Sequence, residues 1–494
     1  MKKLLLAVFS IATTFSLYAQ REVPQERMEQ IYEEVKTPYK YGLAVAPADN
    51  YHKIDCPTVF RQGDKWLMTY VVYNGKGGTD GRGYETWIAE SDNLLEWRTL
   101  GRVLSYRDGK WDCNQRGGFP ALPDMEWGGS YELQTYKGRH WMTYIGGEGT
   151  GYEAVKAPLY VGLAWTKGDI STAHEWESLD KPILSIHDKD AQWWEKLTQY
   201  KSTVYWDKDK TLGAPFVMYY NAGGHHPETN LKGERVGIAL SKDMKTWKRY
   251  SGNPVFAHEA DGTITGDAHI QKMGDVYVMF YFSAFEPSRK YKAFNTFAAS
   301  YDLVNWTDWK GADLIIPSKN YDELFAHKSY VVKHDGVVYH FYCAVNNAEQ
   351  RGIAIATSKS MGRSAVRFPV PESKNRRQIM TLNEGWKTWI TEATHLKGNF
   401  MMPAKTVNIP HNWDDYYGYR QLTHGNLHGT AMYVKDFTAD VKSGKRYFLR
   451  FEGVGTYATI TVNGKNFGRH PIGRTTLTLD VTDELKQGVN RLEV

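Results

Sequence analysis

The chain has 494 residues, a formal net charge of +5, 24% charged residues and 41% hydrophobic residues. This length predicts two or more domains, because domains typically hold about 100–200 residues. The net charge is small for the length and no basic stripe is present, which argues against a nucleic-acid-binding protein.

The N-terminus has the pattern of a secretory signal peptide. Two lysines precede an apolar run, and the small-residue site Leu17-Tyr18-Ala19 closes it, so we expect residues 1–19 to be removed. No cysteine stands at the cleavage site, and no later stretch reaches the roughly 20 apolar residues that a membrane helix needs. The sequence predicts a soluble exported protein without a membrane anchor, secreted to a bacterial periplasm.

The three cysteines, Cys56, Cys113 and Cys343, lie far apart in the chain and lack metal-ligand spacing. We expect buried thiols. One disulfide is the alternative, because an exported protein meets an oxidising compartment.

An apolar strand pattern recurs five times, at residues 65–73, 139–145, 215–221, 276–282 and 337–343, each time downstream of a glycine. A second strand pattern follows each copy, and in the first four copies a polar turn then leads to a tryptophan: Trp97, Trp176, Trp247 and Trp306. Units of three or four short strands separated by turns are typical of propeller blades. The sequence therefore predicts an all-β fold, with a five-bladed β-propeller over residues 20–375 rather than a pair of β-sandwiches.

From about residue 376 the pattern changes to PHNW, FEGVGTYATITVNGK and LKQGVNRLEV. These pieces resemble the amino-terminal jelly-roll sugar-binding domain of glycoside hydrolase family 2. The resemblance implies a C-terminal β-sandwich over residues 376–494, with a structural or sugar-contacting role. We expect the chain to be the front of a longer protein, from which a downstream family 2 catalytic domain is missing.

Propeller geometry places the starts of the first and third strands of every blade at one face. Charged residues and a histidine stand at the expected starts of first strands (Asp55, Glu132, Lys201, Asp267, His327 and Lys328) and of third strands (Glu85, Glu234 and Arg351). Two long loops add Glu148, Glu153, His225, His226 and Glu228. Any one of them alone is more often a solvated or turn-capping residue. Together they predict a site for a polar ligand, because charges gathered in one funnel are costly unless they bind something polar.

The aromatic content, 17 Trp, 33 Tyr and 19 Phe, suits a carbohydrate-active protein, since flat aromatic faces contact the C–H-rich faces of sugar rings. The stretch DCPTVFRQGDKWLMTY resembles the first-blade motif of glycoside hydrolase family 43, in which an Asp at the position of Asp55 is the general base. The similarity then fades, because Lys201 stands where that family has its second Asp, and Asp267 where it has the acid Glu. A family 43-type α-L-arabinofuranosidase or xylosidase is therefore the alternative.

The chain is more similar to glycoside hydrolase family 137, a family of five-bladed β-L-arabinofuranosidases. The resemblance rests on the architecture, an exported propeller followed by a family 2 module, and on the stretches TGYEAVKAP and KGERVGIALS. It implies exo-acting release of L-arabinofuranose from side chains of rhamnogalacturonan-II, a pectic oligosaccharide of the plant cell wall, without a cofactor. It also implies Glu153 as acid/base and Glu234 as nucleophile or base, although the two roles could be exchanged. Glycoside hydrolysis usually needs two such carboxylates in different protonation states.

Under this interpretation the other charged residues at the strand starts bind substrate, and the cations face uronic acids: Asp55, Glu85, Lys201, Asp267, His327, Lys328 and Arg351, with His225 from a loop. Trp127, Trp193 and Trp194 offer stacking faces, with core packing as the alternative for each. No metal is predicted for the His225-His226 pair, and an ion on the propeller axis near His327 stays open. A non-catalytic glycan-binding propeller is the alternative from another class, because it would need no pair of opposed carboxylates.

Overall fold

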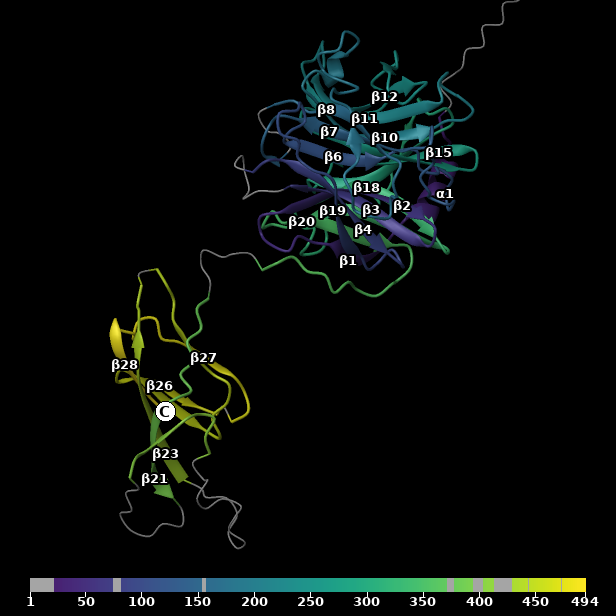
Figure 1. The fold of residues 1–494 in the computed structure, drawn as a ribbon. Coiled ribbons are helices and arrows are strands. Elements are labelled where there is room, and N and C mark those ends of the chain that lie inside the picture. The colour runs from purple at the N-terminus through teal and green to yellow at the C-terminus, as the bar shows by residue number, and fades with distance from the viewer. Residues whose placement is uncertain are drawn as a thin grey trace, which may run out of the picture. The chain divides into compact units, whose positions relative to one another are not determined.

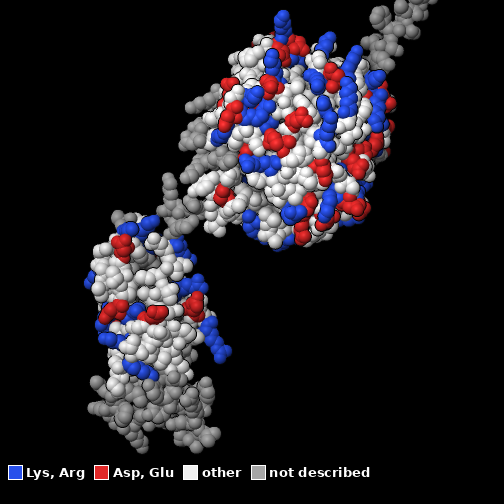
Figure 2. Space-filling model, viewed as in Figure 1, with Lys and Arg blue, Asp and Glu red and all other residues white. Residues whose placement is uncertain are grey.

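A computed structural model of the chain describes residues 22–73, 81–152, 157–370, 377–393, 403–412, 429–442, 444–471 and 473–494. The chain divides into two compact units, Met1–Glu372 and Ser373–Val494, and each is described by itself. Both are nearly all β (Figure 1). Within the described ranges no helix has the length and apolar character to cross a membrane. On the face of the first unit that Figure 2 shows, Lys and Arg are interspersed with Asp and Glu, and no continuous basic stripe is visible.

Twenty strands of the first unit form five antiparallel groups of four, which we number sheets 1 to 5 in chain order; a short parallel pairing of β12 with β14 joins the third and fourth groups into one eight-stranded sheet. Sheet 1 contains β2 (Lys53–Gln62), β3 (Lys65–Tyr73), β4 (Tyr84–Ser91) and β5 (Arg98–Leu104), and sheet 2 contains β6 (Gln115–Pro120), β7 (His140–Gly147), β8 (Tyr160–Thr166) and β9 (Glu177–Ser178). Sheet 3 contains β10 (Thr198–Trp206), β11 (Phe216–His225), β12 (Lys232–Ser241) and β13 (Trp247–Arg249), and sheet 4 contains β14 (Thr263–Met273), β15 (Val276–Ala284), β16 (Ala293–Ser300) and β17 (Thr307–Asp308). Sheet 5 contains β18 (Phe325–His334), β19 (Val337–Val345), β20 (Arg351–Thr357) and, at its outer edge, β1 (Tyr39–Val45) from the start of the chain. The five recurring strand patterns of the sequence are β3, β7, β11, β15 and β19, so these five strands are confirmed.

The five sheets pack in a closed ring. The first strand of each sheet contacts the sheet before it, and β2 of sheet 1 contacts β18, β19 and β20 of sheet 5. Because β1 pairs with β20, the N-terminal strand completes the last sheet and ties the two ends of the ring together. Helix α1 (Gln25–Val35) buries Met28, Ile31 and Val35 in a core that sheets 4 and 5 share.

The polar turn of the sequence repeat has a specific hydrogen-bond pattern. In the third copy, Asp243 accepts hydrogen bonds from the backbone N–H groups of Lys245 and Thr246 at 2.9 and 2.7 Å. Met244 takes a left-handed φ of 70°, and the Trp247 indole N–H donates to its carbonyl at 2.8 Å. Asn93 and Trp97 repeat this arrangement in the first copy. In these two copies the tryptophan thus closes the turn, at or directly before the first residue of the outermost strand.

The first strands of four sheets share a β-bulge near their beginning. The pairing register shifts between Asp55 and Thr58 in β2, between Gln199 and Ser202 in β10, between Gly266 and His269 in β14, and between His327 and Tyr330 in β18. Cys56, Asp267 and Lys328 occupy equivalent bulge positions with left-handed φ values of 51°, 56° and 61°. Bulges bend a strand and redirect its side chains. The side chains at these three bulges therefore point in directions that a regular strand would not give them.

One strand prediction is wrong. The sequence places Glu132 at the start of the first strand of the second repeat, but that place belongs to β6. Glu132 is exposed and lies in the long β6–β7 connection, where it forms an isolated bridge with Arg61. The strand QRGGFP is not predicted from the sequence because glycine and proline are depleted in strands. The stretch YELQTY has a strand-like pattern but does not form a strand.

The second unit contains a six-stranded sheet and a two-stranded sheet. The larger has the order β22 (Lys405–Val407), β21 (Trp386–Ala393), β23 (Gly429–Ala439), β28 (Gly488–Glu493), β25 (Ala458–Val462) and β26 (Lys465–His470), and the smaller pairs β24 (Phe448–Phe451) with β27 (Leu477–Asp480). Trp386, Ile460, Val462 and Leu492 are buried in its core. This unit therefore has a hydrophobic core of its own.

Candidate functional site

Asp55 is the centre of a buried charge cluster at the end of the first unit where the first strands begin. Its side chain is fully buried. The Oδ2 atom accepts hydrogen bonds from the Tyr152 hydroxyl at 2.6 Å, the Lys328 ammonium at 2.8 Å and the Arg351 guanidinium at 3.5 Å. Oδ1 accepts from the backbone N–H of Cys56 at 2.9 Å. The bulges of sheets 1 and 5 thus bring together an acidic and a basic side chain, Asp55 and Lys328, which are 273 positions apart in the chain.

Electrostatics keep this carboxylate ionised. Burial by itself would raise the pKa of Asp55, but the positive charges of Lys328 and Arg351 outweigh it, so the pKa lies well below the usual range. The Arg351 guanidinium also donates to the Tyr152 hydroxyl at 2.6 Å and lies 4.5 Å from the centre of its ring. Asp55, Tyr152, Lys328 and Arg351 therefore form one network, which we call the Asp55 cluster.

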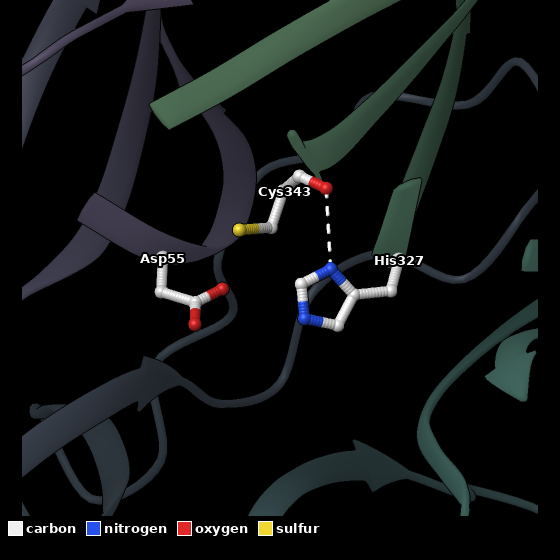
Figure 3. Close-up of side chains that lie close together, drawn as sticks. All are labelled: Asp55, His327 and Cys343. Carbon is white, nitrogen blue, oxygen red and sulfur yellow. Dashed lines mark hydrogen bonds between the residues drawn. The ribbon is translucent and has the colours of Figure 1, made fainter. Parts of the chain in front are cut away.

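Asp55, His327 and Cys343 bring three potential metal ligands within 4.8 Å of one another (Figure 3). The geometry does not fit a cation site. Lys328 and Arg351 already place two positive charges on Asp55, and burial raises the pKa of the Cys343 thiol well above its ordinary value. The His327 Nδ1 atom lies 3.2 Å from the Cys343 carbonyl oxygen. Burial lowers the pKa of His327 to about 3, so the imidazole is neutral and fills space between charges.

A second buried pair lies beside this cluster. The Lys201 ammonium is 3.6 Å from Asp267 Oδ2, and both side chains are almost fully buried. Lys201 also lies 5.4 Å from the centre of the Phe119 ring. Burial raises the pKa of Asp267, and the nearby positive charge of Lys201 only partly offsets this effect. The site end thus contains two carboxyl groups whose pKa values move in opposite directions, Asp55 downward and Asp267 upward.

Glu234 lies at the third residue of β12, next to this pair. Its Oε2 atom accepts a hydrogen bond from the Asn221 side-chain amide at 3.1 Å, and Asn221 Oδ1 accepts from the backbone N–H of Asp267 at 3.3 Å. Asn221 is buried, whereas Glu234 is half-buried. Parallel pairing of Glu234 with Ile264 joins sheets 3 and 4 at this point. Asn221 therefore fixes the position of Glu234 relative to Asp267.

Three residues of the predicted site lie apart from the Asp55 cluster. Glu85 is buried and forms an ion pair of 3.0 Å with Arg102 on β5, the outermost strand of sheet 1. Trp127 lies in the β6–β7 connection, where its indole N–H donates to Glu34 at 2.8 Å. Its backbone N–H donates to Lys272, five residues beyond Asp267 and about 16 Å further along β14.

Trp127 packs against Phe280, and this contact therefore lies at the end of the first unit opposite to the predicted site.

His225 is exposed, at the end of β11, and its Nδ1 atom lies 3.4 Å from the Asn230 carbonyl. Glu153 lies outside the described residues. The predicted residues that the structure brings together are Asp55, Lys201, Glu234, Asp267, His327, Lys328 and Arg351.

Two residues of the site were not identified from the sequence. Tyr152 is an aromatic residue in the long loop of the second repeat, and its hydroxyl contacts the cluster directly. Asn221 follows the apolar stretch PFVMYY and lies in the middle of β11, and a polar residue inside a buried strand was the only available signal. The cysteines lack a disulfide partner: Cys56 and Cys343 are buried free thiols, as predicted, and Cys113 is half-buried.

Comparisons with known proteins identify both units. Residues 412–494 match the family described as glycosyl hydrolase 2 galactose-binding domain-like. A putative beta-glucuronidase of Formosa agariphila is 30% identical over 91 residues, which are 18% of this chain and 11% of that protein. A beta-glucuronidase of Bacteroides fragilis is 29% identical over 117 residues, which are 23% of this chain and 15% of that protein. The chain therefore spans a small part of the length of these curated relatives.

Two solved structures cover much more of the chain. One, described as a glycoside hydrolase, is 95% identical, with a TM-score of 0.71, and the match covers 71% of this chain and 100% of the solved one. The other, described as an RGII complex of BT0996, matches with the same identity, coverage and TM-score. Acids and cations gathered at one end of a nearly all-β ring define a site for a polar ligand. With this degree of identity over the whole of a solved structure, the protein belongs to the glycoside hydrolases.

Proposed function

We propose that the first unit is a five-bladed β-propeller glycosidase that releases L-arabinofuranose from side chains of rhamnogalacturonan-II. The observation that carries this proposal is the 95% identity to a solved glycoside hydrolase, together with a structure of the same identity described as an RGII complex. The five four-stranded sheets packed in a ring support the propeller architecture. The buried acids and cations at one end of the ring support a polar oligosaccharide as ligand.

The proposed catalytic pair is Glu153 and Glu234. Glu234 is half-buried near the start of β12, and one of its oxygens accepts a hydrogen bond from the Asn221 side-chain amide. A nucleophile or base needs a fixed orientation, which this hydrogen bond supports. Glu153 directly follows Tyr152 in the chain, and the Tyr152 hydroxyl contacts Asp55. In the proposed mechanism Glu153 protonates the leaving oxygen, while Glu234 attacks the anomeric carbon or activates water.

The stereochemical outcome depends on the separation of these two carboxyl groups. About 5–5.5 Å leads to retention through a covalent intermediate, and about 6.5–9.5 Å leaves room for water and leads to inversion. In the proposed site Lys201, Lys328 and Arg351 bind oxygens of the sugar and its neighbours. Asp55 keeps Lys328 and Arg351 in place by neutralising part of their charge, and Asp267 does the same for Lys201.

A second mechanism, of the family 43 type, makes Asp55 the general base. One observation favours it: the pKa values of Asp55 and Asp267 move apart, as those of an acid–base pair do. The contacts of Asp55 argue against it, because its two oxygens accept four hydrogen bonds from protein groups. A base needs a lone pair directed at water, so we assign Asp55 a positioning role.

The decisive experiment replaces Glu234 by Gln and measures arabinose release from rhamnogalacturonan-II oligosaccharides by chromatography. Loss of an acid, base or nucleophile lowers turnover by about 10²–10⁴-fold, and binding of the oligosaccharide is expected to persist. Glu90→Gln is the matched control, because Glu90 is also a strand glutamate but pairs with Arg98 at an outer strand. If Glu234→Gln releases arabinose at the parent rate, the catalytic assignment is wrong. If Asp55→Asn abolishes turnover while Glu153→Gln is mild, the family 43-type mechanism replaces it.

The same experiment separates an enzyme from a glycan-binding propeller. A parent protein that binds the oligosaccharides without releasing any sugar would support the binding module. For the location of the protein we propose export to the periplasm, which rests on the leader-like pattern of residues 1–19. Fractionation of cells that produce the full chain, with detection of the mature protein, tests this proposal.

A further inference from the structure

Phe285 is an exposed aromatic residue in a strained backbone conformation. It directly follows β15, at the end of sheet 4 where Ala284 pairs with Ile264 near the start of β14. Its side chain is 49% exposed, and its φ is +58°. A bulky residue with positive φ is an outlier, and such outliers concentrate at functional sites. Neither burial nor backbone preference accounts for a phenylalanine at this position.

Phe325 connects Phe285 to the Asp55 cluster. The two rings meet edge to face, with their centres 6.1 Å apart. Phe325 is the first residue of β18 and is half-buried. The Arg351 guanidinium lies 6.0 Å from the centre of the Phe325 ring, and the same guanidinium contacts Asp55. The aromatic pair therefore continues the wall of the site outward from Arg351 to solvent.

The loop between β15 and β16 adds positive charge to this wall. The Lys292 ammonium lies 5.8 Å from the centre of the Phe325 ring, and Lys292 is exposed. Two other charges of the loop have partners, since Arg289 pairs with Asp313 and Glu286 lies 3.5 Å from His258. Within the part of the chain that the structure describes, Lys292 makes no ion pair. An exposed cation thus lies beside the Phe325 ring, which in turn contacts the Phe285 ring.

We propose that Phe285, Phe325 and Lys292 form a subsite for a carboxylated sugar next to the one that is cleaved. The sugar's C–H face packs on the two rings, and its carboxylate binds the Lys292 ammonium. This subsite rests on the proposed function for its ligand class, an acidic pectic oligosaccharide. Aromatic rings and a cation together match an acidic sugar, because the Lys292 ammonium binds a carboxylate more strongly than the hydroxyls of a neutral sugar.

The test uses the full chain and rhamnogalacturonan-II oligosaccharides, before and after chemical reduction of their carboxyl groups to alcohols. Phe285→Ala and Phe285→Gly are expected to raise KM for the untreated oligosaccharides about tenfold, with kcat changed less. Lys292→Met is expected to raise KM about three- to fivefold for the untreated oligosaccharides and to have no effect on the reduced ones. Titrations in a Glu234→Gln background measure binding without turnover.

Two controls separate binding from folding. Lys290→Met removes an exposed charge from the same loop, and Tyr39→Ala removes an equally exposed aromatic ring, 49%, from the outer strand of sheet 5. Both are expected to leave KM unchanged. Because glycine tolerates positive φ, Phe285→Gly is expected to retain the parent Tm. A lower Tm with an unchanged KM would make Phe285 structural and overturn the proposal.

Two further outcomes are distinguishable. If the parent protein releases a sugar other than arabinose while Phe285→Gly still weakens binding, the subsite stands and the proposed activity is wrong. If arabinose release requires Glu234 but neither Phe285→Ala nor Lys292→Met changes KM or binding, the activity stands and the subsite is wrong. Equal effects of Lys292→Met on untreated and reduced oligosaccharides would exclude the carboxylate as its partner.

Discussion

Replacement of Asp55 by Asn tests the central electrostatic argument. Asn has nearly the same shape as Asp but no charge, so the buried Lys328 ammonium loses the carboxylate 2.8 Å away. Removing one partner of a buried ion pair costs about 3–5 kcal/mol, because the other charge stays buried without compensation. A unit of about 350 residues has an unfolding entropy near 0.7 kcal/mol/K, so this loss lowers Tm by about 4–7 °C.

Circular dichroism melts of the parent and Asp55→Asn proteins at pH 7 measure this difference. Asp322→Asn is the matched control. Asp322 is also a buried carboxylate held by one lysine, Lys40, and one tyrosine hydroxyl, that of Tyr342 at 2.8 Å. It lies beside β1, away from the Asp55 cluster, so its replacement is expected to lower Tm while arabinose release persists. Asp55→Asn is expected to reduce both Tm and release.

The pH dependence gives a second, independent measurement. The folded-state pKa of Asp55 lies below its ordinary value of about 3.9, so its stabilising contribution is present above that pH and is lost as pH falls further. The difference in unfolding free energy between parent and Asp55→Asn is therefore expected to be constant from pH 5 to 8 and to shrink below about pH 4. Equal Tm values at pH 7, or a difference that grows on acidification, would refute the ion-pair argument.

Three further predictions concern other parts of the site. His327 is neutral in the folded protein, where its pKa is about 3, whereas in the unfolded protein the same imidazole takes up a proton below about pH 6.5. The parent protein therefore loses unfolding free energy as the pH falls from 6.5 to 5. His327→Asn is expected to make this loss smaller by about 2 kcal/mol, as measured by urea titrations. Glu85→Gln is expected to lower stability by about 1–3 kcal/mol through its bond to Arg102 and to leave kcat/KM within about twofold; a tenfold loss of kcat/KM would restore Glu85 to the substrate site. The Gln350 side-chain amide donates to Asn50 Oδ1 at 2.7 Å and to the Pro369 carbonyl at 2.6 Å. Gln350→Leu is expected to lower kcat/KM several-fold by loosening the adjacent Arg351, and Gln350→Glu is expected to do so as well, because Glu cannot donate. Unchanged kinetics in both variants would exclude this role.

The strands of the first unit were largely accessible from sequence. The pattern KWLMTYVVY and its four counterparts are buried on both faces, and continuous apolar stretches bounded by turns are the signal of such strands. In two copies the tryptophan marks turn closure, because its indole N–H donates to a carbonyl three residues back: Trp97 to Leu94 and Trp247 to Met244. β6 was missed for the opposite reason, since its glycines and proline carry no strand signal and it is defined only by pairing with β7.

The contacts of the site could not be derived in the same way. Glu85 and Glu234 both stand near the starts of third strands, yet Glu85 pairs with Arg102 and Glu234 with Asn221. The sequence predicts Trp127 as a residue that stacks on sugar, because a tryptophan exposed for binding and one packed in a core cannot be told apart from the sequence alone. Its packing on Phe280 depends on where the β6–β7 connection folds, and no local pattern encodes that path.

The sequence by itself determined the repeat, the all-β class and the residue types at the strand starts, because these are properties of local periodicity and turn chemistry. Only the tertiary structure decided which of those residues meet. Asp55 and Lys328 lie 273 positions apart, and they form an ion pair because the ring closes sheet 5 onto sheet 1 and two β-bulges redirect their side chains. The same closure brings Phe325 beside Arg351. Such contacts depend on long-range packing and backbone strain, and neither leaves a signal in the residues on either side.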